Sequence, residues 1–142
     1  MRKLVVLLGG AAVAALTVVA LASARPSVIM VGAKLDAMQE VPHSMSTGKG
    51  AFTADITGNT LKWRLTFSHL TGAASAAHIH VGKKGKAGKV LVALCGPCKS
   101  GQKGTMKISP MVTRDIKRGL AYVNVHTKKY ANGEIRGQLA TH

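Results

Sequence analysis

The chain has 142 residues, and its 20 lysines and arginines against five acidic residues give a formal net charge of +15. This length suits one domain with a single modest core and leaves no room for a second domain. The positive charge favours anionic surfaces such as acidic glycans or lipid headgroups, or serves solubility alone. Nucleic acid is not an expected partner, because the basic residues lack interleaved aromatics for base stacking.

The first residues have the features of a secretory signal peptide. Arg2-Lys3 precedes an uncharged apolar run over residues 4–21, and Ala22-Ser23-Ala24 offers the small-residue pattern that signal peptidase cleaves. We expect residues 1–24 to be removed and residues 25–142 to form an exported domain, periplasmic or extracellular, with no transmembrane span. An uncleaved anchor is the alternative, because the apolar run is near the lower limit for crossing a bilayer.

The rest of the chain has the pattern of short strands separated by turn residues. Apolar and polar residues alternate over residues 52–56 and 61–67, and Gly58-Asn59 between them is typical of a hairpin turn. One short helix is expected over residues 110–118, because Pro110 suits its start and Gly119 its end. Further strands are expected over residues 28–35, 76–81, 89–94, 105–109, 120–127 and 134–140. About eight such strands predict an all-β fold, an antiparallel Ig-like or Greek-key β-sandwich with one short helix.

Three histidines are candidate metal ligands. His78 and His80 share one face of an expected strand because side chains alternate, and His126 lies on the polar face of a later strand. Three imidazoles can bind zinc and leave its fourth position open, and the same set suits copper. Glu134 is a candidate fourth ligand, or an acceptor for a ligand ring. The excess of basic residues opposes binding of a dication.

The same polar faces also allow a structural interpretation, which the sequence slightly favours over a metal. Asn124, Glu134 and Arg136 meet on one face if the last two strands pair across the turn at Asn132-Gly133. An ion pair of Arg136 with Glu40 or Glu134 would anchor a network that fixes the strand register. Catalysis by the histidines is a weaker alternative, because no serine or cysteine has the context of a nucleophile.

The two cysteines have the spacing of a thioredoxin active site, Cys95-Gly96-Pro97-Cys98. A redox dithiol needs its first thiol at a helix N-terminus, and the residues after Cys98 are poor helix formers. In an exported protein two cysteines most simply form one structural disulfide. We therefore expect a disulfide, with a thiol–disulfide oxidoreductase as the alternative.

Four lysines cluster in a glycine-containing loop that follows the strand of His78. They form an expected basic surface for an anionic glycan, a lipid headgroup or a protein partner. These residues are Lys83, Lys84, Lys86 and Lys89.

Several stretches in order resemble the CHRD domain, a module named for chordin that also occurs singly in exported bacterial proteins. They are Gln39-Glu40-Val41-Pro42, Ala77-His78-Ile79-His80, Tyr122-Val123-Asn124-Val125-His126-Thr127 and Gly133-Glu134-Ile135-Arg136-Gly137-Gln138-Leu139. The resemblance spans residues 31–139 and implies an all-β extracytoplasmic domain of the sandwich type. It carries over no catalytic residues, and it includes neither the cysteine spacing nor the lysine-rich loop. We expect a binding or structural module without catalytic activity, with a copper- or zinc-binding protein as the first alternative.

Overall fold

The computed structural model describes residues 26–142, so the predicted signal peptide lies outside the described residues. Nine strands and one α-helix follow one another in this part of the chain. The strands are β1 Val28–Asp36, β2 Lys49–Thr57, β3 Thr60–Ser68, β4 Ala74–Val81, β5 Val90–Cys95, β6 Gln102–Lys107, β7 Ala121–Thr127, β8 Ile135–Gln138 and β9 Ala140–Thr141. A short 3-10 turn, η1 Ala37–Gln39, follows β1, and helix α1 Pro110–Lys117 precedes β7.

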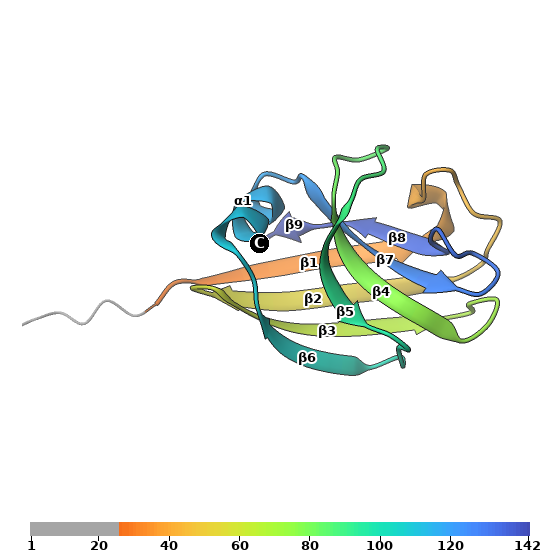
Figure 1. Cartoon of the computed structure of the whole chain (residues 1–142), viewed down its shortest axis with the longest axis horizontal. Coiled ribbons are helices and arrows are strands. Elements are labelled where there is room, and N and C mark those ends of the chain that lie inside the picture. The colour runs from red at the N-terminus through yellow and green to blue at the C-terminus, as the bar shows by residue number, and fades with distance from the viewer. Residues whose placement is uncertain (1–25) are drawn as a thin grey trace, which may run out of the picture.

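The strands form one antiparallel sheet in the order β5-β4-β7-β8-β1-β2-β3-β6, with β9 beside β1 (Figure 1). The sheet is nearly closed, and its edge strands β5 and β6 are consecutive in the chain. The predicted all-β fold with one short helix is therefore confirmed. No helix within residues 26–142 combines the length and apolar character needed to cross a bilayer.

The hairpin of β2 and β3 forms as its alternation predicted. Phe52 pairs with Leu65 and Ile56 with Leu61, and all four side chains are buried. Gly58 in the connecting turn has a φ of +56°, a conformation that glycine adopts without steric cost. The polar residues between these positions face away from the core, which makes this part of the sheet apolar on one side only.

The core lies between the two halves of the curled sheet. Apolar side chains from β1, β2 and β3 pack with those of β4, β7 and helix α1. Each such side chain that is fully buried contributes about 1.5–3 kcal/mol of transfer free energy. The largest fully buried apolar members are Phe52, Leu35, Ile56, Leu61, Leu65, Ile79, Ile116, Ile135 and Leu139.

Helix α1 begins and ends close to the predicted residues. The Ser109 hydroxyl accepts a hydrogen bond from the Val112 amide at 3.3 Å, and Pro110 occupies the first turn. Gly119 follows the helix with a φ of +66°. Val112 and Ile116 point into the core, whereas Met111 is 48% exposed.

Two predicted strands differ from the structure at their ends. Residues 105–109 were expected to form a strand, but β6 begins earlier because Gln102 already pairs with Leu65. The chain leaves the sheet before Ser109, which caps the helix. The last predicted strand is divided into β8 and β9, which pair with different parts of β1.

Strand β7 is buried on both of its faces, and this property positions the candidate site. Val123 and Val125 face the core as predicted, but Tyr122, Asn124 and His126 on the opposite face are also buried. The loop between β4 and β5 contributes to this cover, since the Gly88 amide donates to the Tyr122 hydroxyl at 3.2 Å.

Candidate functional site

The three predicted histidines converge on the covered face of β4 and β7. In the register of these strands His78 pairs with Asn124 and His80 with Tyr122, while His126 is opposite Ala76. One ligand atom from each of the three imidazoles lies within 4.8 Å of the others. His80 and His126 are buried and His78 is half-buried, so the cluster is reached from the side of His78.

Backbone carbonyls fix the tautomers of two of these rings. His80 Nδ1 lies 2.9 Å from the Gly88 carbonyl oxygen, and His126 Nδ1 lies 2.9 Å from that of Ala131. Because a carbonyl oxygen only accepts, both Nδ1 atoms carry hydrogen in the neutral rings and both Nε2 atoms carry a lone pair. His126 Nε2 uses its lone pair to accept from His78 Nδ1 at 3.0 Å.

His80 Nε2 is buried and has no hydrogen-bond partner among the described residues. Its ring stacks on Tyr122, with the centroids 4.9 Å apart and the planes 10° from parallel. Together with the Gly88 contact, this packing holds the ring in one orientation. A buried nitrogen lone pair without a hydrogen-bond donor is unusual, and it calls for a water, a ligand or an ion as its partner.

Burial and the neighbouring imidazoles favour the neutral forms of His78 and His126. Burial lowers the pKa of His78 below its ordinary value, and neighbouring His80 lowers it further. Burial also lowers the pKa of His126, as do His78 and His80, against the opposing effect of the hydrogen bond to Ala131. Neutral imidazoles at pH 7 have the protonation state that metal ligation requires.

Glu134 does not join the histidines, contrary to its predicted role as a ligand. Its carboxylate is fully buried elsewhere and accepts from the Ser46 hydroxyl at 2.6 Å, the Thr71 amide at 2.7 Å and the Thr71 hydroxyl at 2.8 Å. The Thr127 hydroxyl donates to it as well. Burial raises the pKa of Glu134, but these donors together hold it below its usual value. Glu134 precedes β8, so strand alternation does not govern its direction.

Arg136 is buried beside the cluster without the predicted ion pairs. Its Cζ lies 3.4 Å from the centroid of the Tyr122 ring, and it donates to the Lys83 carbonyl at 3.2 Å and to Gln138 Oε1 at 3.3 Å. Neither Glu40 nor Glu134 forms a salt bridge with it in the described part of the chain. The cation is instead held against an aromatic face, where the ring quadrupole attracts it.

Glu40 and Asn124 form a second buried polar contact on this side of the sheet. Burial raises the pKa of Glu40 to about 7, while Arg136, the Val41 amide and the Asn124 side chain act in the opposite direction. Gly133 packs against both residues, and a Cβ at this position would lie 2.3 Å from Glu40 Oε1 and 2.8 Å from Asn124 Nδ2. The predicted network thus consists of separate contacts around Glu40, Glu134 and Arg136.

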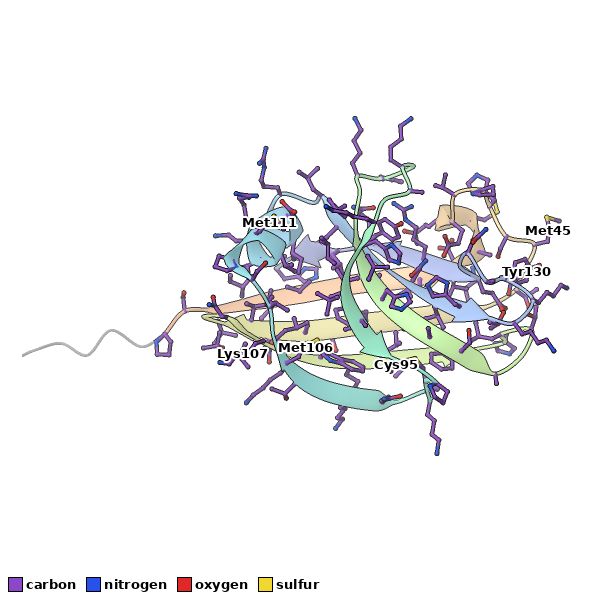
Figure 2. The ribbon with its side chains drawn as sticks, viewed as in Figure 1. Met45, Cys95, Met106, Lys107, Met111 and Tyr130 are labelled. Carbon is purple, nitrogen blue, oxygen red and sulfur yellow. A yellow bond between two sulfur atoms is a disulfide. The ribbon has the colours of Figure 1, made fainter. Side chains whose placement is uncertain are left out.

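Cys95 and Cys98 form the predicted disulfide, and the described residues contain no free cysteine. Cys95 ends β5, at the tip of that strand in Figure 2. The segment after Cys98 leads into strand β6, so no helix N-terminus adjoins these sulfur atoms in residues 99–107.

The lysine-rich loop projects from the body of the sheet between β4 and β5 (Figure 1). Its base is fixed, because Val81 donates to the Lys89 carbonyl at 3.0 Å and Gly82 to the Leu120 carbonyl at 2.8 Å. The four predicted lysines are exposed and form no salt bridge among the described residues. They are Lys83, Lys84, Lys86 and Lys89.

Sequence reasoning did not find the groups that orient the histidines. Gly88 and Ala131 act through backbone carbonyls, which have no signature in the sequence. The stacking of Tyr122 on His80 depends on the pairing of β4 with β7, which no local pattern indicates. Gly88 also packs closely, since a Cβ there would lie 1.8 Å from the Val81 carbonyl oxygen.

A family model for the CHRD domain matches residues 31–139 of this chain. This range includes the histidine cluster, the lysine-rich loop and the disulfide. Searches of the curated proteins and of the solved structures give no significant match. Because the matched range covers well over half of its length, the chain belongs to the CHRD domain family.

Proposed function

We propose that this domain, for which membership of the CHRD family supports a binding or structural role, is exported and has no catalytic activity. Its ligand is one copper or zinc ion held by His78, His80 and His126. The observation that carries this proposal is the lone pair of His80 Nε2, which is buried beside two other imidazoles and has no partner in residues 26–142.

The dimensions of the cluster suit such an ion. Bonds of about 2.1 Å in a tetrahedral arrangement separate two ligand nitrogens by roughly 3.4 Å. The three ligand atoms lie within 4.8 Å of one another, so small rotations of the rings bring them to bonding distance. His78 is the accessible ring and would move most. His78 Nδ1 donates its hydrogen to His126 Nε2, so ligation through His78 Nδ1 would require the other neutral tautomer, with the hydrogen on Nε2.

Two carbonyl acceptors suited to a second coordination shell lie beside the histidines. Metal-bound histidines donate their other ring N–H to a carbonyl or carboxylate, which fixes the ring and raises its basicity. The Gly88 and Ala131 carbonyls supply this acceptor to His80 and His126. Arg136, whose charge opposes a cation, is engaged by Tyr122 and the Lys83 carbonyl. The carbonyl acceptors of His80 and His126 and the contacts that engage Arg136 favour a metal site over a network whose only role is to fix the strand register.

Calorimetric titration of metal-free protein with zinc and with copper tests the proposal. We expect one ion per chain for the unmodified protein and no binding for the His78→Ala/His80→Ala variant. The matched control is His43→Ala/His69→Ala, which removes two exposed histidines outside the cluster and keeps the full stoichiometry. Equal binding by both double variants would assign the metal to other residues and contradict the proposal.

The lysine-rich loop supports a second proposed activity, adsorption to an anionic lipid surface. A projecting loop with four exposed lysines fits a flat layer of headgroups, and each basic residue near such a surface contributes about 1 kcal/mol. Replacing the four lysines with glutamine should abolish sedimentation with vesicles that contain phosphatidylglycerol. Unchanged sedimentation would contradict the proposal that these lysines bind an anionic lipid surface. Thiol–disulfide exchange is not proposed, because β6 follows the cysteines where a redox site needs a helix.

A further inference from the structure

A groove of about 600 Å³ lies on the outer face of the sheet, away from the histidine cluster. Strands β1, β2, β3 and β6 form its floor, and the C-terminal His142 borders it. The groove exists because small residues occupy the middle of this face. Gly32 pairs with Thr53, so neither of these neighbouring outward positions carries a large side chain. His142 lies across Gly32, where an added Cβ would meet its Nε2 at 2.9 Å.

Cations line the opposite side of this groove. Arg64 on β3 pairs directly with Lys103 on β6, which places their Cα atoms about 5 Å apart. Lys62 lies two residues before Arg64 in β3, about 7 Å from it on the same face. All three side chains are exposed, and none forms a salt bridge within the described residues. Asp55 is the one acidic residue among those that line the groove.

We propose that this groove binds a linear acidic polysaccharide, with Lys62, Arg64 and Lys103 contacting its carboxylate or sulfate groups. Like charges directly opposite one another destabilise a sheet, so an anionic partner would offset the repulsion between Arg64 and Lys103, whereas Lys62 lies opposite Asp55. A chain that carries an anionic group every one or two sugars matches cations at this spacing. Strands β1, β2 and β3 are paired on both sides within the sheet, so a peptide cannot bind on this part of the floor by adding a strand.

The form of the groove also argues against the other polyanions. A lipid surface is flat and cannot enter a recess between β1 and β6. Single-stranded nucleic acid binds through aromatic rings on which its bases stack. Trp63, the aromatic residue other than His142 that lines this groove, is only 5% exposed and turns its ring inward against Gly104. A polysaccharide needs neither a flat contact nor base stacking.

The test compares two variants that remove equal charge from the two basic areas of the full chain. Lys62→Gln/Arg64→Gln/Lys103→Gln changes the groove, and Lys83→Gln/Lys84→Gln/Lys86→Gln changes the projecting loop. Binding is measured by titration with heparin as the sulfated probe, polygalacturonate as the carboxylated probe and dextran as the neutral one. A third variant, Thr53→Tyr, fills the groove without any change of charge, at an exposed strand position that accepts an aromatic residue.

We expect the groove variant to lose about tenfold or more in affinity for at least one acidic polysaccharide, since three charge contacts disappear. The loop variant should change by less than about twofold, and Thr53→Tyr should weaken binding while circular dichroism shows a folded protein. Equal losses of affinity in the two charge variants would show that binding depends only on the net charge of the protein, and would overturn the proposal. Unchanged binding by Thr53→Tyr, no binding to either acidic polysaccharide, or a greater loss of affinity for single-stranded DNA than for polysaccharide in the groove variant would also overturn it. Metal titration of the groove variant, expected to be normal, keeps this result independent of the histidine site.

Discussion

The buried carboxylate of Glu134 provides a quantitative test of how the site is supported. We consider Glu134→Gln, which preserves the size of the side chain and removes its charge. The two carboxylate oxygens accept four hydrogen bonds, from Ser46, from the amide and hydroxyl of Thr71, and from Thr127. Three of the four donors are hydroxyl groups, which can rotate to accept from the amide of glutamine.

The expected loss follows from the strength of these bonds. A hydrogen bond to a charged group contributes about 1.5–3 kcal/mol, and one between neutral groups contributes about 1 kcal/mol. Glutamine keeps the bonds but loses this difference of about 0.5–2 kcal/mol per bond, so we expect a loss of at least about 2 kcal/mol over four contacts. Asp55→Asn is the control, because Asp55 is exposed and its side chain has no hydrogen bond among the described residues; we expect a change below about 0.5 kcal/mol.

Urea denaturation between pH 7 and pH 3 measures both the loss and its origin. The pKa of Glu134 is lower in the folded protein than in the unfolded chain. Its stabilisation is therefore complete above the unfolded pKa of about 4.3 and disappears as the pH falls through the folded value. The gap between the two proteins should close below about pH 4. A variant within about 0.5 kcal/mol of the unmodified protein at pH 7, or a gap independent of pH, would refute this reasoning.

Three further predictions concern other parts of the domain. Gly88→Ala places a Cβ against the Val81 carbonyl, so the free energy of unfolding of this variant should fall by about 1–3 kcal/mol, and its metal affinity should fall as well. Gly72→Ala is the control, because its Cβ meets no atom within 4 Å, and it should change neither quantity in the same titrations. Burial raises the pKa of Glu40 to about 7, so the folded protein keeps the proton on Glu40 between about pH 4.5 and 7 and loses stability as the pH rises through that range. Glu40→Gln should flatten this part of the stability profile in urea denaturation. An unchanged slope would count against the raised pKa of Glu40. Cys95→Ser/Cys98→Ser removes a disulfide that closes a very short loop, and thermal unfolding should show a loss of about 2 kcal/mol with metal binding unchanged.

Local patterns in the sequence were sufficient to predict much of the sheet. The alternation in residues 52–56 and 61–67 defined a hairpin because both strands have one buried face. The polar residues of β7 were assigned to one face for the same reason. That this face is buried could not be predicted, since its cover comes from the loop at residues 82–89, whose position depends on the pairing of β4 with β7.

The sequence indicated which histidines come together but not where Glu134 lies. Alternation brought His78 and His80 together, and His126 joined them because β4 and β7 are neighbours. Glu134 was assigned wrongly, because Gly133 has a φ of +132° and turns the chain just before β8 begins. Its actual partners, Ser46 and Thr71, are 88 and 63 residues away in the sequence, and no local pattern indicates such contacts.

The metal content of the full-length protein, purified without added metal or chelator from the exported compartment, tests the central proposal most directly. Elemental analysis should find one copper or zinc ion per chain in the unmodified protein and in the His43→Ala/His69→Ala control. The His78→Ala/His80→Ala variant, prepared in parallel and shown to be folded, should contain almost none. Equal and negligible metal in the unmodified protein and in this variant would contradict the account and leave the three imidazoles with a structural role.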